Sequence, residues 1–363
     1  MSADDELKKL REQIDGIDDR IRALIVERAR CAHRVADVKR AADGDATVFY
    51  RPEREAQVLR RMRDAENSPL DGEAVARVFR EIMSACLALE QKLRVAYLGP
   101  EGTFTQQAAI KHFGHGVATV PLAAIDDVFR EVEAGAANYG VVPVENSTEG
   151  MITHTLDSFM RFGLRVCGEV ELRIHHHLLL SESNKRENIT RVYSHQQSLA
   201  QCRQWLDTHL PGVERVAVSS NAEAARRIRG EWHAAAIAGE MAAELYGLGK
   251  VAENIEDNPN NTTRFLIIGR DSVARSGDDK TSLLVSMRDK PGALYRLLEP
   301  FNREGISLTR LESRPSKNAN WSYVFFIDCE GHQDDARLQA ALKSVEDAAL
   351  EVRVLGSYPK AVL

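Results

Sequence analysis

The chain has 363 residues, of which 44% are hydrophobic and 28% are charged, and this size predicts a multidomain protein with two or three cores. Its 48 basic and 54 acidic residues give a net charge of −6, which argues against a nucleic-acid-binding protein. The chain contains no apolar run of the roughly 18–20 residues that span a bilayer, its first residues are acidic and polar, and its five cysteines include no CxxC pair. We therefore expect a reduced cytoplasmic protein without a membrane segment, a disulfide scaffold or a metal site.

The segment 1–93 is predicted to be helical. Apolar residues recur at steps of three and four from Leu7 to Val38, and Arg28 occupies one position of this seam. The spacing predicts a single helix over about 4–40, roughly 50 Å long. Because a compact domain of this size cannot cover so long a rod, we expect a second chain to cover its apolar stripe. Two further helices are expected, from Arg51-Pro52 to a break at 67–69 and from Asp71 to Leu93.

Three basic residues lie in or beside this seam. Arg28 and Lys39 are 11 residues apart, about 20° around the helix and roughly 16 Å along it, so their long side chains can bracket one small anion. Arg11 precedes Arg28 by 17 residues, or about 25 Å, and reaches that anion only from a second chain. Because buried unpaired cations are costly, they indicate a bound anion or a carboxylate partner. A coiled-coil interface with snorkelling basic side chains is the alternative.

The segment LREQIDGIDDRIRALIVERARCAHRVADVKR, followed by YRPEREAQVL and the SACLALEQ helix, resembles the all-helical chorismate mutase family. The resemblance implies an intertwined dimer that rearranges chorismate to prephenate. Such a Claisen rearrangement needs no nucleophile, base or cofactor, but it needs donors at the ether oxygen. By resemblance, Arg11 of one chain and Arg28 of the other hold the substrate carboxylates and Lys39 contacts the ether oxygen. The remaining implied site residues are Arg54, Glu55, Cys86 and Glu90.

The segment departs from the family pattern in two places. Arg51 stands where the family often has Asp, and Cys86 and Glu90 stand where it has Ser and Gln. Glu90 can donate a hydrogen bond to the ether oxygen only when it is protonated, so we predict mutase activity that falls as the pH rises through neutrality. A helical unit that serves only for dimerisation is the alternative.

From Arg94 onward, short apolar runs alternate with helical segments, which predicts α/β layering with mainly parallel sheets. Ligands of such folds bind beyond the carboxyl ends of the strands, where helix N-termini favour anions. Taken singly, such polar residues before a helix are most often simple N-caps rather than parts of a binding site. They are Thr103, Asn146, Ser147, Ser194 and His195. The run His175-His176-His177 alternates between the two faces of a predicted strand, so we expect no metal site there.

Just before a later apolar strand, Thr263 offers a hydroxyl and Arg264 a bidentate fork for a carboxylate. Together with YLGPEGTFTQ, VPVENSTEG and YSHQQSLAQC, the TTRF motif makes residues 94–271 resemble prephenate dehydratase. The resemblance implies two α/β lobes closing over a cleft, as in a small periplasmic binding protein, and conversion of prephenate to phenylpyruvate. Thr263 is the implied donor to the leaving hydroxyl, although Glu145 or a water is an open alternative as the proton source, and Arg264 is implied to hold a carboxylate. The implied pocket residues are Thr103, Glu145, Asn146, Ser147, Ser194, His195, Gln201, Thr263, Arg264 and Phe265.

The segment 279–363 has the element order βαββαβ, which predicts an antiparallel ferredoxin-like sheet with two helices on one face. GAL at 292–294 and ESRP at 312–315 resemble the ACT regulatory domain of prephenate dehydratases, in which phenylalanine binds between paired domains. A plain dimerisation domain is the alternative. The implied effector residues are Pro291, Gly292, Ala293, Leu294, Leu311, Glu312, Ser313 and Arg314.

The three resemblances together cover nearly the whole chain. They imply a bifunctional enzyme of phenylalanine biosynthesis that acts on chorismate and prephenate without a cofactor, is inhibited by phenylalanine, and forms a homodimer or homotetramer. Two alternatives stay open. One is a phenylalanine-binding regulatory protein with decayed catalytic pockets, and the other is a dehydratase whose helical unit serves only for dimerisation.

Overall fold

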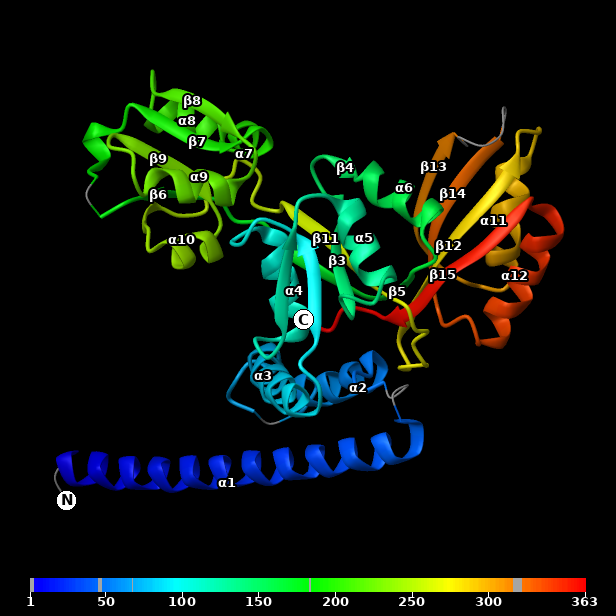
Figure 1. Ribbon diagram of the computed structural model, residues 1–363, viewed down its shortest axis with the longest axis horizontal. Coiled ribbons are helices and arrows are strands. Elements are labelled where there is room, and N and C mark those ends of the chain that lie inside the picture. Colours follow the sequence, from blue (N-terminus) through cyan, green and yellow to red (C-terminus); the bar gives the residue numbers. More distant parts are fainter. Residues whose placement is uncertain (1–2, 45–47, 67, 183, 316–321) are drawn as a thin grey trace.

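The computed structural model describes residues 3–44, 48–66, 68–182, 184–315 and 322–363. Its elements form three parts in chain order (Figure 1). We call them the helical unit (3–90), the two-lobed unit (94–269) and the C-terminal unit (279–359). Within the described ranges, none of the helices is long and apolar enough to cross a membrane.

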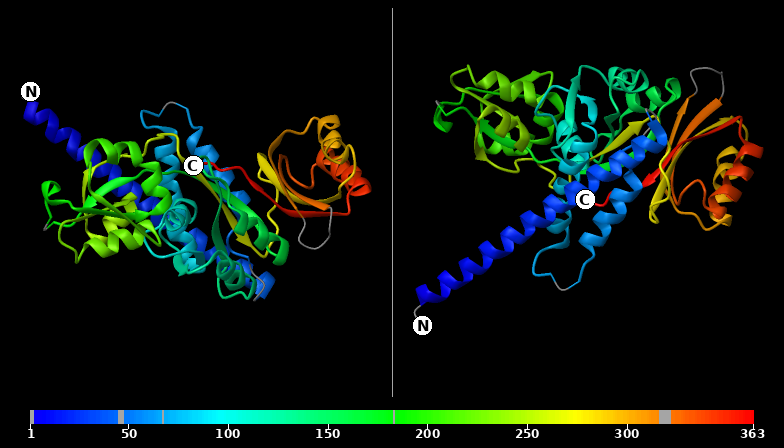
Figure 2. Two further views of the ribbon diagram at one scale, coloured as in Figure 1. Left: turned by 90° about the horizontal axis from the view of Figure 1, so that it is seen from above. Right: turned by 60° about the horizontal axis from the view of Figure 1, so that its bottom comes forward.

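The helical unit consists of α1 (Ala3–Asp43), α2 (Pro52–Arg63) and α3 (Gly72–Glu90). The single long helix is therefore confirmed, and at 1.5 Å per residue it is about 60 Å long. Its N-terminal end extends away from the rest of the chain in both views of Figure 2. The apolar side chains along its seam are 48% to 70% exposed, and they are Leu7, Leu10, Ile14, Ile17, Ile21, Leu24, Val35 and Val38. One chain alone therefore leaves this stripe uncovered.

Contacts from α2, α3 and the loop before α2 attach the helical unit to the two-lobed unit and the C-terminal unit. Val362 and Leu363, at the end of the chain, pack against a small core around Leu59 and Met83. Arg60 donates to the Ser276 hydroxyl at 3.0 Å. In the loop before α2, the Tyr50 hydroxyl lies 3.0 Å from His112 Nε2 of the two-lobed unit. The helical unit is thus fixed to the remainder through α2 and its neighbours, whereas most of α1 is not.

The first lobe of the two-lobed unit is built on the sheet β2-β1-β3-β11-β5. Strand β11 (Thr262–Gly269) returns from the second lobe and runs antiparallel between its two neighbours, so the sheet is mixed rather than mainly parallel as we expected. The other elements are β1 (Arg94–Leu98), α4 (Phe104–Phe113), β2 (Ala118–Leu122), α5 (Ile125–Glu133), β3 (Tyr139–Asn146), β4 (Gly150–Met151), α6 (Thr153–Arg161) and β5 (Arg165–Arg173).

The second lobe has the strand order β10-β6-β9-β7-β8. This sheet is also mixed, because β6 runs antiparallel to both β9 and β10 while β7 is parallel to β8 and β9. Two segments of chain, after β5 and before β11, join the lobes. The elements are β6 (His177–Leu180), β7 (Arg191–His195), α7 (Gln196–Gln201), α8 (Arg203–His209), β8 (Glu214–Val218), α9 (Asn221–Ile228), β9 (Ala234–Ala238), α10 (Glu240–Tyr246) and β10 (Gly249–Ala252).

The C-terminal unit has the predicted βαββαβ order and an antiparallel sheet with the strand order β13-β14-β12-β15. The ferredoxin-like expectation is therefore confirmed. Its helices pack with the sheet over a core that includes Leu297, Phe301 and Leu338. Its elements are β12 (Asp279–Arg288), α11 (Ala293–Arg303), β13 (Leu308–Pro315), β14 (Ser322–Glu330), α12 (Ala336–Ala348) and β15 (Glu351–Pro359).

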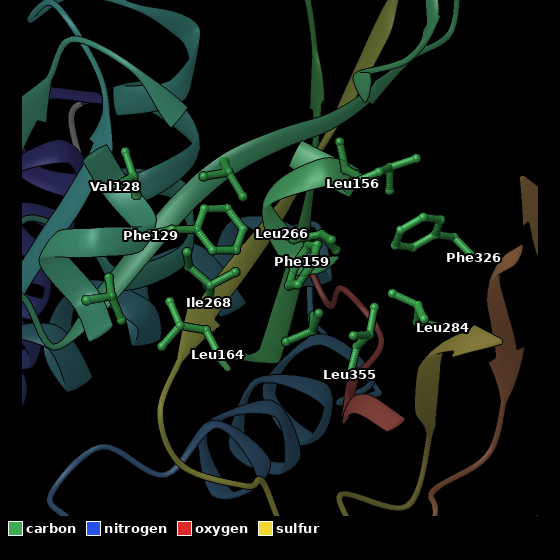
Figure 3. Packing of buried hydrophobic residues seen from close by; sticks show 14 of the residues in the cluster. Val128, Phe129, Leu156, Phe159, Leu164, Leu266, Ile268, Leu284, Phe326 and Leu355 are labelled. Carbon is green, nitrogen blue, oxygen red and sulfur yellow. The ribbon is translucent and has the colours of Figure 1, made fainter. Parts of the chain in front are cut away.

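The other face of this sheet packs on the first lobe. Figure 3 shows Phe129 and Phe159 of the lobe in one buried cluster with Phe326 and Leu355 of the C-terminal unit. At Gly356 the backbone of β15 comes so close to β5 that an added Cβ would lie 2.2 Å from the Val166 carbonyl oxygen. Only glycine permits such a close approach, so Gly356 allows the C-terminal unit to pack closely against the first lobe.

Candidate active sites

A cleft of about 460 Å³ lies between the two lobes. Its lining includes side chains that follow strand ends of the first lobe and others from the second lobe, as expected for an α/β fold. Six of the predicted pocket residues line it together. They are Thr103, Asn146, His195, Gln201, Thr263 and Phe265.

Two of these residues also cap helices. The Thr103 hydroxyl accepts from the Gln106 N–H at 3.5 Å at the start of α4, and His195 Nδ1 accepts from the Gln197 N–H at 3.4 Å at the start of α7. The Ser220 hydroxyl caps α9 in the same way, by accepting from Glu223 N–H at 3.0 Å, and it lines the cleft as well. Because α4 and α9 begin at the cleft, their N-terminal dipoles favour negative charge there.

Thr263 is 8% exposed, and its hydroxyl oxygen accepts a hydrogen bond from Asn146 Nδ2 at 2.8 Å. Since the oxygen is already engaged as an acceptor, the hydroxyl proton remains for a group in the cleft. This is the geometry that a donor to a leaving hydroxyl requires.

Arg264 does not lie in the cleft. Side chains alternate along a strand, and the Arg264 guanidinium points from the opposite face of β11 into the contact with the C-terminal unit. It donates to Glu169 at 2.9 Å, to Asp328 at 2.6 Å and to the Tyr358 hydroxyl at 3.0 Å. Burial acts to lower the pKa of Arg264, but Tyr358, Asp328 and Glu169 outweigh it and raise the pKa above its ordinary value. Carboxylates of the protein thus occupy the fork that we expected to hold a carboxylate of the substrate.

Three more predicted pocket residues lie outside the cleft lining. Glu145 forms an ion pair with Arg310 of the C-terminal unit. The fully buried Ser194 hydroxyl lies 2.7 Å from the Ile237 carbonyl oxygen and 2.9 Å from Asn221 Oδ1, and it donates its single proton between them. Ser147 accepts from the Thr262 N–H at 3.0 Å, which joins the loop after β3 to the start of β11.

Other residues at the cleft were not predicted from the sequence. His176, Asn221 and Phe104 line it, and Asn261 bonds to the lining residues Asn146 and Gln201. The three consecutive histidines do have three different surroundings, since His175 bonds to Glu256 and His177 accepts from the Asn254 N–H. However, His175 and His176 lie in the segment between the lobes rather than in a strand.

In the helical unit, the predicted residues Lys39 and Arg28 both influence the pKa of a third, Glu90. Glu90 is half-buried, and burial raises its pKa while Lys39, Arg40 and Arg28 act in the opposite direction. Lys39 Nζ donates to the Phe49 carbonyl at 3.3 Å, and an Arg40 guanidinium nitrogen lies 2.5 Å from the Glu90 carbonyl oxygen. Part of the predicted anion site is therefore assembled at the C-terminal ends of α1 and α3.

The remaining predicted residues of this site are Glu55, Cys86, Arg54 and Arg11. Glu55 is paired with Arg80 at 2.5 Å with only 14% of its side chain exposed, and burial raises its pKa although Arg80 and Arg28 act in the opposite direction. Cys86 is buried, Arg54 is exposed, and Arg11 is exposed near the far end of α1, about 25 Å from Arg28 along the helix. Within one chain the predicted set is therefore incomplete.

Comparison with known proteins matches all three parts of the chain. Family models for chorismate mutase type II, prephenate dehydratase and the ACT domain match residues 10–91, 95–273 and 281–347. The bifunctional chorismate mutase/prephenate dehydratase of Stutzerimonas stutzeri is 64% identical over 100% of both chains, and that of Pseudomonas aeruginosa is 62% identical over the same shares. The chain belongs to the bifunctional chorismate mutase/prephenate dehydratase family. The resemblances that we drew from the sequence are confirmed.

A solved structure is similar to the dehydratase and ACT parts. The prephenate dehydratase of Arthrobacter aurescens, in complex with L-Phe, is 36% identical with a TM-score of 0.69. The match covers 74% of this chain and 90% of that one. The fold of two α/β lobes followed by an ACT domain is thus shared with a dehydratase.

In the ACT domain, the two predicted effector motifs lie at the same end of the sheet. Tyr323 pairs with both Met287, just before the GAL turn, and Pro315, at the end of ESRP. Gly292 in that turn has a φ of +77°, which favours glycine. The Arg314 guanidinium lies 3.3 Å from Asp157 of the first lobe. The remaining effector residues lie around these positions, with Leu294 and Leu311 44% and 42% exposed.

Proposed function

We propose that this chain converts chorismate to prephenate at residues 1–93 and prephenate to phenylpyruvate in the cleft of residues 94–271, under control of an ACT domain at 279–363. The observation that carries the dehydratase half is the Thr263 hydroxyl, held by Asn146 at the cleft with its proton left for the substrate. The two reactions form a sequence, since the product of the first is the substrate of the second.

In the dehydratase step the bond to the ring carboxyl group breaks and carbon dioxide leaves. The electron pair moves through the ring, the bond to the ring hydroxyl breaks, and the ring becomes aromatic. The departing hydroxide needs a hydrogen-bond donor and finally a proton, and Thr263 is the donor in our proposal. Because Arg264 is engaged elsewhere, we propose that the N-terminal ends of α4 and α9 favour the substrate carboxylates.

In the mutase step, Arg28 of one chain holds a carboxylate of chorismate, and Lys39 and protonated Glu90 of that chain donate to the ether oxygen. We propose that Arg11 comes from a second copy of the chain in a homodimer, or in a homotetramer built from such dimers. The exposed apolar seam of α1 supports this proposal, since exposed apolar stripes of this extent mark interaction surfaces.

We further propose that L-phenylalanine binds the ACT domain at its GAL and ESRP motifs and inhibits the dehydratase. The L-Phe complex of the similar Arthrobacter aurescens enzyme supports this assignment. Inhibition requires that phenylalanine bind two states of the enzyme with different affinity. Strand β11 carries Thr263 to the cleft and Arg264 to the ACT domain, so it is a direct link between them. All five cysteines are free thiols, which suits a reducing cytoplasm.

The test is an assay of the purified full-length chain with chorismate and, separately, with prephenate. The proposal expects phenylpyruvate from both substrates and prephenate as the intermediate from chorismate. Phenylpyruvate from prephenate alone would contradict the mutase half, and no phenylpyruvate from either substrate would contradict the dehydratase half. A calorimetric titration with L-phenylalanine checks the effector, and absence of binding heat would contradict the regulatory claim.

A further inference from the structure

A continuous series of hydrogen bonds between side chains connects His176 to Thr263. His176 Nε2 lies 2.9 Å from Gln201 Oε1, and Gln201 Oε1 also accepts from Asn261 Nδ2 at 3.0 Å. Asn261 Oδ1 accepts from Asn146 Nδ2 at 2.9 Å, and the same Asn146 amide nitrogen donates to Thr263. Residues from both lobes and from both segments between them thus meet in one network beside the cleft.

The donor and the acceptor of each hydrogen bond in this series can be assigned, starting from Asn146. Asn146 Oδ1 accepts from the backbone N–H groups of Thr148 and Glu149, at 2.9 and 3.1 Å. Because backbone N–H groups can only donate, the Asn146 oxygen must face them and its NH₂ must face Asn261 and Thr263. Asn261 then presents its oxygen to Asn146 and its NH₂ to Gln201.

The same logic fixes the tautomer of His176. Gln201 presents an oxygen, so His176 Nε2 must carry a hydrogen and donate it. Nδ1 then has no hydrogen. His176 is 1% exposed, and within the described part of the chain its Nδ1 has no hydrogen-bond partner. A buried acceptor without a donor is unfavourable, so the fold retains this histidine at a cost that a purely apolar side chain would avoid.

We propose that His176, as the neutral Nε2–H tautomer, is a positioning residue of the dehydratase reaction. It fixes the Gln201 amide, and through Asn261 and Asn146 it keeps the Thr263 oxygen an acceptor, so that the Thr263 proton points to the substrate. His176 does not itself touch the reacting atoms. Burial lowers the pKa of His176, so the ring stays neutral and keeps this tautomer around pH 7. The inference rests on the proposed dehydratase function.

The test compares two amide variants of the full-length enzyme. In His176→Gln the longer side chain can bring an amide N–H near the place of Nε2, whereas in His176→Asn the shorter one cannot reach Gln201. We expect His176→Asn to lower dehydratase kcat by about 10- to 100-fold with KM changed less than about threefold, since misplacement of a reacting group by about 1 Å costs up to about 100-fold. His176→Gln should stay within about fivefold of wild type.

A double-mutant cycle then separates positioning from a merely structural role. If His176 acts through Thr263, His176→Asn should cause no further loss of kcat in a Thr263→Ala background. The same fold loss in both backgrounds, or wild-type kcat in His176→Asn, would overturn the proposal.

Mutase activity serves as the folding control. If His176→Asn fails to fold, Gln201→Met removes the same link, and an unchanged kcat or a loss that persists in the Thr263→Ala background contradicts the proposal equally. Absence of dehydratase activity in the wild-type chain would instead contradict the proposed function, so the two failures are distinguishable.

Discussion

The cleft and the helical unit differ in how complete they are within one chain. Beside the cleft, Asn146 bonds to Thr263 and to Asn261, and Asn261 bonds to Gln201. In the helical unit, Lys39 and Arg28 both act to lower the pKa of Glu90, but Arg11 lies far along an exposed helix. Within one chain, the residues at the cleft are therefore organised by the fold, whereas Arg11 lies too far from Arg28 to share one ligand with it.

Two physical reasons account for this difference. The two lobes pack their own cores and bring strand ends together, so buried polar groups can satisfy and orient one another in advance. A helix of about 60 Å cannot bury its apolar stripe within one small unit, so its seam stays exposed in the single chain.

The largest effect is expected where the strand that carries Thr263 meets the ACT domain. Arg264→Met removes the cation that Asp328 and Glu169 share in a buried site. Glu169 keeps its ion pair with Lys280, but Asp328 loses its cation, and this should lower the free energy of unfolding by about 3–5 kcal/mol. Urea unfolding of the full-length chain measures it. Arg161→Met, which removes an exposed pair with Asp126, is the matched control and should cost less than about 1 kcal/mol. Equal costs would show that the buried network does not hold the two units together.

Loss of one hydroxyl in the cleft is the next largest effect. Thr263→Ala should lower dehydratase kcat by about 10²- to 10³-fold, because it removes a donor to developing negative charge. Thr263→Ser keeps the hydroxyl and should retain activity within about tenfold. Mutase activity of both variants should equal that of wild type, and near-normal dehydratase turnover in Thr263→Ala would remove Thr263 from its role.

A smaller effect is expected in the helical unit, where burial raises the pKa of Glu90. The protonated form is the donor, so mutase activity is full below that pKa and falls as the pH rises through it, by about tenfold per pH unit. Glu90→Gln keeps a donor at every pH and should flatten this limb of the kcat/KM profile. A profile of unchanged shape in the variant would exclude Glu90 as the donor to the ether oxygen.

Much of the fold could be predicted from the sequence because its patterns are local. The steps of three and four predicted α1 closely, and the βαββαβ order predicted the C-terminal sheet. The mixed sheets could not be read in this way, since β11 belongs to the first lobe although it follows the second in the chain. Pairing between distant strands leaves no local pattern.

The site residues also divide into those that local motifs indicate and those whose place depends on packing between distant parts of the sequence. Thr103, Asn146, His195, Gln201 and Thr263 come from short motifs, and the structure brings them together at one cleft. Alternation along a strand separates Thr263 from Arg264, but only the packing of the ACT domain on the other face explains where Arg264 goes. The place of His176 depends on Gln201 and Asn261, which are distant in sequence, so three adjacent histidines gave no indication of it.

The central claim is that the dehydratase site is complete in one chain and the mutase site is shared between two. Mixing Arg11→Ala and Arg28→Ala chains after joint unfolding and refolding tests it most directly. Each variant alone should lose about 100-fold or more of mutase activity. The mixture should regain about a quarter of wild-type activity, because each mixed symmetric dimer contains one intact site, while dehydratase activity stays at the wild-type level throughout. A mixture no more active than its separate components would contradict the shared site.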